Sequence, residues 1–464
     1  MRRILYVYVR GGAPLEYAFP RIAACGELHV LALAPLPAAA REAWLPSCTR
    51  IAEVPEPPRG EALVELIVEH AKALGADAVL TLSEFAVLAV AHAARRLGLA
   101  GAGPGILRAR DKRLMREAWA AAEVPVPHFR RVDSEQELRS ATAELTPPLL
   151  LKPAWGAGSV AQLVLHSPED AAPAWSQIED ALHAGRRVGM DELYAPDTDR
   201  DRLVEEIAQG STAGWYEEPG YGDYVSVEGI VARGVYHPLA VTAKLPTVPS
   251  FVEVASTSPC VLPEPLQRRI EEVSRRAVDA LGLETCGTHT ELKLLPDGQL
   301  VVIETAARFG GLLTIRQLEE VFGLDPIGLL VRELLGERVS YPATMPTAGT
   351  GRVGAAASLA VVPADAAGVP WRTGARWDPE AVDWLSLLSP GSTIEPVPAF
   401  ALPPGRPVPA FDPSGGSRNW LGVYLLTAVD AATLRRDCNA VLDGLEAALH
   451  RIPPTRYPPT HGAH

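Results

Sequence analysis

One segment near the middle of the chain, residues 286–311, places two acidic side chains in otherwise apolar, hairpin-like surroundings. A Pro-Asp-Gly-Gln sequence supplies the predicted turn. If Leu295 pairs with Leu300, Glu291 falls directly opposite Glu304, with Cβ atoms roughly 5 Å apart. Two like charges at that spacing repel each other, so the pattern predicts a cation between them. Hard oxygen ligands of this kind suit Mg²⁺.

A basic residue follows the second acidic side chain at short distance. Arg308 comes four residues after Glu304, within a bend that contains several glycines. The guanidinium group binds phosphoryl oxygens well, because its N–H groups match their geometry. This end of the segment therefore favours a phosphate-handling site.

Length and charge restrict the remaining possibilities. A chain of 464 residues suggests about three domains. Its net charge of −13 argues against a nucleic-acid partner, whose phosphates need a basic face. The five cysteines are scattered without metal-type spacing, so we expect free thiols of a reducing cytoplasm. Ser83, Glu84 and His92 interrupt the longest apolar stretch, which argues against a membrane span.

The hydrophobic pattern divides the chain into four predicted parts. Residues 1–104 alternate short apolar runs with helical patterns, as in an open α/β sheet. Residues 105–190 and 191–345 hold the phosphate-type motifs, and residues 346–464 shift to a composition rich in Pro, Gly and Ala, which we assign to a C-terminal domain. We expect a helix over residues 312–335 and a final helix near residues 431–450. The glycines after the first strand lack the spacing of a dinucleotide site and indicate a tight turn.

Three further signals are individually weak. Lys152 ends an apolar strand before a loop with glycines, where backbone N–H groups can approach phosphate oxygens, although an ordinary strand end would look the same. Lys112 lies near the start of a helix predicted over residues 106–122, and among its basic neighbours it can equally be a solvated charge. Residues 203–210 read as a hinge that ends in glycine, or as a plain edge strand.

Their order along the chain is more specific. The chain resembles the ATP-grasp superfamily over roughly residues 1–345 in a series of motifs: Asp111-Lys112, Leu151-Lys152-Pro153, Val204-Glu205-Glu206, Ser226-Val-Glu228, His289-Thr-Glu291 and Glu304-x-Ala-Ala-Arg308. Within it, the motifs around residues 214–229, 251–253, 288–293 and 304–309 resemble the bacilysin-synthetase type of L-amino-acid ligase. The resemblance implies an α/β and α+β chain: an ATP-grasp fold with an N-terminal Rossmann-like domain and a C-terminal α+β domain.

The resemblance also implies a role for each matching residue. ATP would be bound by Lys112, Lys152, Ser159, Glu205, Glu206, Ile207 and Ala208. Mg²⁺, as two ions for which Mn²⁺ can substitute, would be bound by Glu291 and Glu304. The catalytic residue that steadies the transferred phosphoryl group would be Arg308. The amino-acid pocket would be bordered by Glu253, Ser256, His289, Thr290, Arg308, Phe309, Gly310, Gly311 and Leu312.

The implied function is an ATP-dependent ligase that joins two L-amino acids into a dipeptide through an acyl-phosphate. Its partners would be small amino acids, with no nucleic acid and no membrane, and a homodimer is implied by similarity only. Such a reaction needs a mobile lid, because water would hydrolyse the acyl-phosphate. Two rivals stay open: an ATP-grasp ligase that joins a non-proteinogenic carboxylic acid to an amine in natural-product biosynthesis, and a non-catalytic nucleotide-binding module.

The chain departs from the family pattern at three positions. Ala306 replaces an Asn that many ATP-grasp enzymes carry, but the bacilysin-type ligases also lack this Asn. Ser256 stands where the family member we compare has a His, and Leu312 stands where it has a Trp that narrows the first pocket. We therefore hypothesise a first substrate bulkier than alanine, while Leu312 can equally be a core residue beneath a differently closed pocket.

Overall fold

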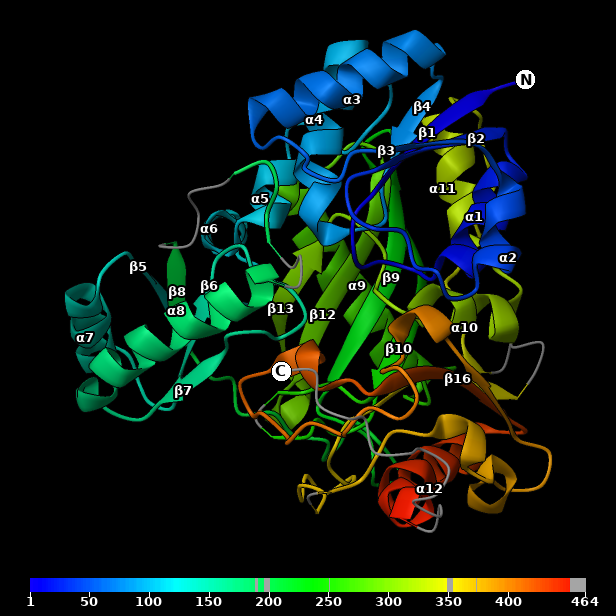
Figure 1. Ribbon diagram of the computed structural model, residues 1–464. Coiled ribbons are helices and arrows are strands. Elements are labelled where there is room, and N and C mark those ends of the chain that lie inside the picture. The colour runs from blue at the N-terminus through cyan, green and yellow to red at the C-terminus, as the bar shows by residue number, and fades with distance from the viewer. Residues whose placement is uncertain (188–190, 196–200, 250, 349–353, 373, 451–464) are drawn as a thin grey trace, which may run out of the picture.

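The computed structural model describes residues 1–187, 191–195, 201–249, 251–348, 354–372 and 374–450, and its chain forms three sheets (Figure 1). The first sheet is parallel, with the strand order β3-β2-β1-β4. Its strands are β1 (Arg3–Tyr8), β2 (Glu27–Ala32), β3 (Cys48–Glu53) and β4 (Ala78–Leu80). Its helices are α1 (Leu15–Ala23), α2 (Arg41–Trp44), α3 (Glu61–Leu74) and α4 (Val87–Leu97). The predicted open α/β sheet is confirmed.

The second sheet is small, antiparallel and ordered β5-β8-β6-β7. Its strands are β5 (Phe129–Val132), β6 (Leu149–Pro153), β7 (Leu163–Leu165) and β8 (Arg202–Glu206). Two helices pack on it, α7 (Glu135–Glu144) and α8 (Ala171–Arg187). The alternative that residues 203–210 form an edge strand is wrong, because β8 lies between β5 and β6.

The third sheet has eight strands in the order β13-β12-β9-β10-β11-β14-β16-β15. Its strands are β9 (Tyr224–Ala232), β10 (Val235–Lys244), β11 (Ala255–Ser258), β12 (Cys286–Leu294), β13 (Leu300–Ala306), β14 (Ala355–Val361), β15 (Thr393–Pro396) and β16 (Gly422–Ala428). Its helices are α9 (Glu264–Leu281), α10 (Thr314–Phe322), α11 (Pro326–Leu334) and α12 (Ala431–His450). Because β11 pairs with β14, this sheet continues across the predicted boundary at residue 346, and the domain boundaries themselves stay predictions.

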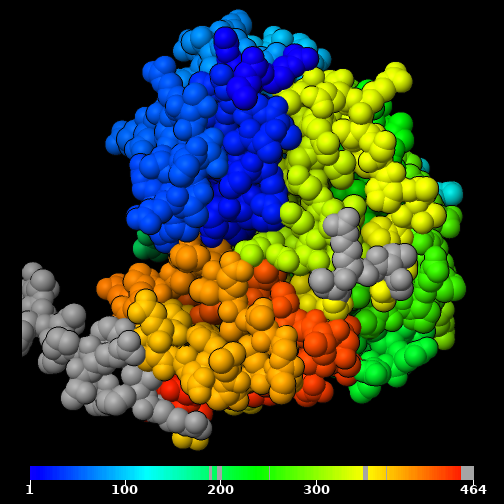
Figure 2. Space-filling view, turned by 90° about the vertical axis from the view of Figure 1, so that its right-hand side faces the viewer, coloured from blue at the N-terminus to red at the C-terminus, as the bar shows by residue number. Residues whose placement is uncertain are grey.

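The parts share their cores. One apolar cluster joins the third sheet to α12, and another joins β1 and α1 to α11. Figure 2 shows this second contact on the surface, where blue N-terminal residues lie against yellow-green residues, with the orange C-terminal part beneath them.

Two predicted helices are each divided in the structure. The helix expected over residues 106–122 consists of α5 (Ile106–Arg110) and α6 (Lys112–Ala121). Asp111 separates them, because its extended backbone ends α5 and its carboxylate accepts from the N–H of Arg113 at 2.9 Å, which caps α6. The stretch 312–335 is similarly divided into α10 and α11, whereas α12 is confirmed with the predicted bounds.

In the hairpin of β12 and β13 the two carboxylates pair as predicted, although the strand register differs from the predicted one. Leu300 pairs with Leu294, so the expected partner Leu295 is wrong. A β-bulge at Ile303 then shifts the register by one residue, and Glu291 lies opposite Glu304 as predicted. Without the bulge, Glu291 would face Ile303 and the two carboxylates would not meet.

The structure also bears on the predicted free thiols and on the predicted absence of a membrane span. All five cysteines carry free thiols. Among the described helices, none combines the length and the apolar character needed to cross a bilayer.

Candidate functional site

A cavity of about 290 Å³ lies between the second and the third sheet. Its wall includes most of the predicted site residues: Lys112, Lys152, Ser159, Glu205, Glu206, Ile207, Ala208, Glu253, Ser256, His289, Glu291, Glu304, Arg308, Gly311 and Leu312. Three predicted residues, Thr290, Phe309 and Gly310, are not part of this wall. Thr290 points to the other face of the sheet, where its hydroxyl lies 3.0 Å from the hydroxyl of Thr305, and Phe309 is 2% exposed in the core.

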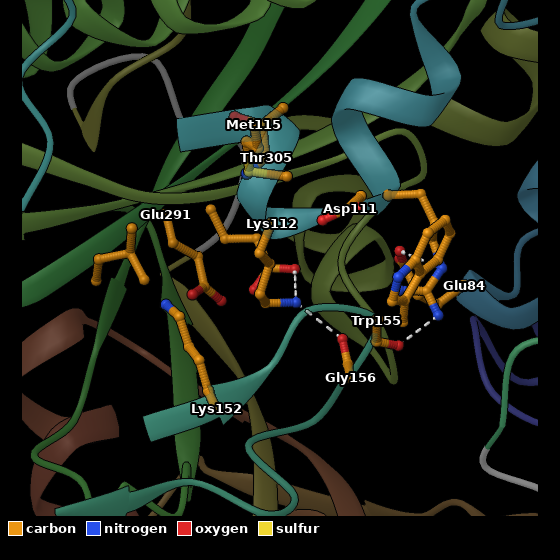
Figure 3. Close-up of polar contacts among 12 residues, drawn as sticks. Glu84, Asp111, Lys112, Met115, Lys152, Trp155, Gly156, Glu291 and Thr305 are labelled. Carbon is orange, nitrogen blue, oxygen red and sulfur yellow. Dashed lines mark hydrogen bonds and ion pairs between the residues drawn. The ribbon is translucent and has the colours of Figure 1, made fainter. Parts of the chain in front are cut away.

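Lys112 connects the hairpin to the glycine-rich loop, residues 156–161. Its Nζ donates to Oε1 of Glu304 at 2.8 Å and to the carbonyl oxygen of Gly156 at 2.8 Å (Figure 3). The residue is 4% exposed, so the alternative of a solvated charge is wrong. The break at Asp111 brings this lysine to the first position of α6, where it faces the cavity.

Lys152 is held in the same cavity by a buried carboxylate. Its Nζ forms an ion pair with Glu205, whose other oxygen accepts from Nε of Arg116 at 3.0 Å. Burial lowers the pKa of Lys152 to about 8, although the Glu205 carboxylate favours the charged form. The side chain of Glu205 thus positions the Lys152 ammonium group. The sequence had suggested Glu205 for adenine binding instead.

The backbone at the end of β8 lies beside the cavity, and whether it acts as a hinge stays a prediction. The N–H of Glu206 donates to the carbonyl oxygen of His128 at 2.9 Å, and the N–H of Ile207 donates to that of Pro148 at 3.0 Å. Within the described part of the chain, no acceptor is recorded for the N–H of Ala208, which also lines the cavity. This N–H is therefore available to the edge of a planar ring such as adenine.

His289 lies between two carboxylates. Its Nδ1 contacts Glu228, and its Nε2 lies 3.1 Å from Oε1 of Glu291. Burial opposes the charged form, but the Glu228 carboxylate and then the bond to Glu291 outweigh it and raise the pKa of His289 to about 9. The resulting imidazolium, with Lys244 and Arg308, lowers the pKa of Glu291 although burial would raise it. Both groups are therefore charged at neutral pH.

The ion pairs of His289 with Glu228 and Glu291 predict a pH-dependent contribution to folding stability. Because the folded-state pKa of His289 lies above 6.5, its stabilisation is complete below that pH and is lost as the pH rises through about 9. We expect the difference in the free energy of unfolding between the native chain and His289→Gln to fall by about 3 kcal/mol over this window. Denaturant titrations at pH 6, 7.5 and 9 measure it, and a constant difference would contradict the assigned pair.

Arg308 is held by a residue of the N-terminal part. Its Nε lies 2.8 Å from Oε2 of Glu84, which is 6% exposed, while Oε1 of Glu84 lies 3.6 Å from Nε of Arg110. Burial opposes the charged carboxylate, but Arg308, Arg110 and Lys112 outweigh it and lower the pKa of Glu84. The guanidinium of Arg308 therefore reaches the cavity from a fixed direction.

Part of the cavity wall combines polar and apolar side chains that suit an organic substrate, and we call it the substrate end: Lys244, Glu253, Ser256 and Leu312. Lys244, which is 3% exposed, lies with its Nζ 3.5 Å from Oε2 of Glu253. Ser256 accepts a hydrogen bond of 2.9 Å from Nε2 of Gln317, so its own O–H hydrogen is free to point into the cavity. Leu312, with φ +58°, also lines this end.

No role was predicted from the sequence for four residues of this site: Glu84, Arg116, Glu228 and Lys244. Two of them left a signal. Glu228 is a lone carboxylate within the apolar strand β9, and Glu84 interrupts the apolar stretch of β4 and α4. A buried charge needs an oppositely charged partner, so each of these two carboxylates indicated that such a partner exists but did not show which residue it is.

The paired glutamates fit a divalent cation. In the described residues there is no cluster of three or more His, Cys, Asp or Glu side chains that could hold a metal ion. Mg²⁺ commonly takes one or two carboxylates and completes its shell with phosphate oxygens and water. Glu291 and Glu304, which face each other beside Lys112, match that donor set.

Comparison with known proteins agrees with this geometry. The ATP-grasp domain family matches residues 145–316. The alanine–anticapsin ligase of Bacillus subtilis (strain 168) is 38% identical over 272 residues, which are 58% of this chain and 56% of that protein. The Bacillus amyloliquefaciens enzyme of the same name is 36% identical over 61% of this chain and 59% of its own length. The chain thus spans less than two thirds of these curated relatives.

The fold itself extends over nearly the whole chain in one solved structure. An L-amino acid ligase from Bacillus licheniformis superimposes with a TM-score of 0.68 and 18% identity, over 97% of this chain and 98% of that chain. At that identity the likeness concerns the fold, which is the mixed α/β ATP-grasp fold that the sequence predicted.

Proposed function

We propose that this chain, whose residues 145–316 match the ATP-grasp domain family, is an ATP-dependent carboxylate–amine ligase that joins two L-amino acids into a dipeptide. The pairing of Glu291 with Glu304 carries this proposal, because it lies in one cavity with both lysines and Arg308. The same cavity extends past the charged groups to Ser256 and Leu312, which leaves room for an amino acid beside a triphosphate.

The chemistry needs no nucleophilic side chain. A carboxylate oxygen of the first amino acid attacks the terminal phosphorus of ATP, and ADP leaves. The amine of the second amino acid then attacks the acyl carbon, loses a proton, and displaces inorganic phosphate as the amide forms. Activation is required because an unphosphorylated carboxylate has no good leaving group.

The charged residues stabilise the phosphoryl group as it moves. Lys112 and Lys152 would contact the phosphates, and Arg308 would contact the transferred group and the acyl-phosphate. Glu291 and Glu304 would hold Mg²⁺, which neutralises charge on the phosphate oxygens when it is bound. The number of ions, and the use of Mn²⁺ in their place, are part of the proposal.

Mass spectrometry of the products tests the function directly. Incubation with ATP, Mg²⁺ and pooled proteinogenic amino acids is expected to give dipeptide, ADP and phosphate in equal amounts. Absence of any ADP release with these acids would contradict the proposal and would favour the ligase of a non-proteinogenic acid. Nucleotide binding without turnover on any acid would favour the non-catalytic module.

The first substrate is proposed to be bulkier than alanine, because Leu312 lines the substrate end of the cavity. Replacing Leu312 by the larger tryptophan (Leu312→Trp) is expected to reduce kcat/KM for leucine or phenylalanine as carboxyl donor by about 10- to 100-fold, with less effect on alanine. Leu385→Trp, at a leucine that is 75% exposed, is the matched control. Strict alanine preference in the native enzyme would contradict the larger pocket.

The homodimer implied by the resemblance also remains a proposal. Light scattering of the purified chain during size-exclusion chromatography measures its mass, and a mass near 49.5 kDa would contradict it.

A further inference from the structure

A turn in the C-terminal part of the chain contacts the glycine-rich loop. This C-terminal turn comprises residues 412–420 and lies more than 250 positions away along the chain. The N–H of Ala161 donates to the carbonyl oxygen of Ser414 at 3.3 Å, and the N–H of Ser417 donates to that of Gly158 at 3.0 Å. Two backbone hydrogen bonds therefore fix the loop to the turn.

The two backbones approach so closely that one position in the turn has no room for a side chain. Gly416 has φ +50°, in the left-handed region that favours glycine. A Cβ at this residue would lie 2.5 Å from the carbonyl oxygen of Gly158 and 2.6 Å from the backbone of Ser159. Any larger residue would have to push the glycine-rich loop away.

The same turn also reaches the substrate end of the cavity. Ser417 and Trp420 both line the cavity wall. The indole N–H of Trp420 donates to the carbonyl oxygen of Glu253 at 3.1 Å, which ties the turn to the segment beside Lys244. The turn thus bridges the loop on one side and the substrate segment on the other.

Internal hydrogen bonds give the turn a defined shape. The side chain of Asn419, which is 3% exposed, donates to the carbonyl oxygens of Asp412 at 2.8 Å and Gly416 at 3.1 Å. It also accepts from the N–H of Asp412 at 2.9 Å. A turn held in this way can act as a template for the loop that rests on it.

We propose that the C-terminal turn positions the glycine-rich loop over the terminal phosphates and, by holding it there, keeps water from the acyl-phosphate. This inference rests on the proposed ligase function and makes the C-terminal part a component of the active site. The turn positions other groups and performs no chemical step. Its loss should uncouple ATP cleavage from amide formation more than it weakens substrate binding.

Hydrogen exchange of the full-length chain, without substrates, tests the contact. Gly416→Ala is expected to speed exchange in peptides that contain Ala161 by at least about tenfold, because the added methyl group displaces the loop. Gly98→Ala is the matched control, since Gly98 has φ +67° and its Cβ would meet no atom within 4 Å. Unchanged exchange in Gly416→Ala, or equal acceleration in the control, would overturn the proposal.

A second variant covers the case in which Gly416→Ala does not fold. Asn419→Ala introduces no steric conflict and removes the hydrogen bonds that shape the turn, so it is expected to speed exchange of the same peptides. If exchange at Ala161 stays as in the native chain, the turn does not hold the loop. This comparison decides the contact even if the chain forms no amide with any amino acid.

The functional consequence is measured as the ratio of phosphate released to amide formed. The ratio is expected to rise severalfold in Gly416→Ala while KM for ATP changes little, and to stay near the native value in Gly98→Ala. A ratio that stays at the native value in Gly416→Ala would show that the turn does not protect the acyl-phosphate.

Discussion

Replacing Glu304 by glutamine is expected to reduce amide formation by about 10²–10³-fold while the chain stays folded. The Glu304 carboxylate lies opposite Glu291 and accepts a hydrogen bond from Lys112 at 2.8 Å. The neutral glutamine side chain therefore removes one of the two anionic groups available to Mg²⁺. Its side chain is 25% exposed in the cavity, which limits the cost to folding. ADP release and product mass measure the activity, and thermal unfolding measures the fold.

A matched surface variant separates charge loss at the site from charge loss in general. Glu65→Gln removes a carboxylate that is 60% exposed and pairs with Arg96 on the surface. It is expected to leave turnover unchanged. Native-like turnover in Glu304→Gln would contradict the assignment of the metal pair and, with it, the ligase proposal.

Replacing Glu84 by glutamine is expected to destabilise the fold by about 3–5 kcal/mol and also to lower kcat. The stability falls because Arg308 and Arg110 lose a buried counter-charge. The rate falls because Arg308 is no longer fixed in the direction of the cavity. Denaturant titrations and steady-state kinetics at saturating ATP measure the two effects.

Glu192 offers a control for the structural part of this effect. Its carboxylate accepts from Nε of Arg110 at 2.8 Å and is buried, but no contact with Arg308 is recorded among the described residues. Glu192→Gln should therefore destabilise the chain without the drop in kcat. Equal loss of kcat in both variants would mean that Glu84 acts only through stability.

A double-mutant cycle can isolate the interaction. If Glu84 positions Arg308, the kcat effects of Glu84→Gln and Arg308→Lys should not add, because the second change acts on a guanidinium that the first has already released. Additive effects would indicate that the two residues act independently.

The carboxylate hairpin shows how far the sequence reached. The alternation of side chains and the turn led to the prediction that Glu291 pairs with Glu304, but the predicted register was off by one residue and the bulge at Ile303 restored the pairing. The bulge at Ile303 could not be read in this way, because an extra residue in one strand depends on what the strand packs against. Here the carbonyl oxygen of Ile303 accepts from Nη2 of Arg116 at 2.7 Å, a contact from another part of the chain.

The lysines show a similar division. Their residue type and their order before the hairpin could be read from the sequence, but their burial could not. Lys112 is buried where its Nζ reaches Glu304 and the carbonyl oxygen of Gly156, and Lys152 is buried against Glu205 and Arg116. Both depend on partners distant in sequence, which local patterns do not reveal.

Local patterns along the chain were enough to predict the open α/β sheet near the N-terminus, the two acidic side chains of the hairpin and an arginine beside them, because strand alternation and turn residues act over a few neighbouring positions. The contacts of Glu84 with Arg308, of Glu228 with His289 and of Gly416 with the glycine-rich loop could be seen only in the folded chain. Each of these contacts joins separate strands or segments, and its energy depends on burial and on distances that exist only after the chain has packed.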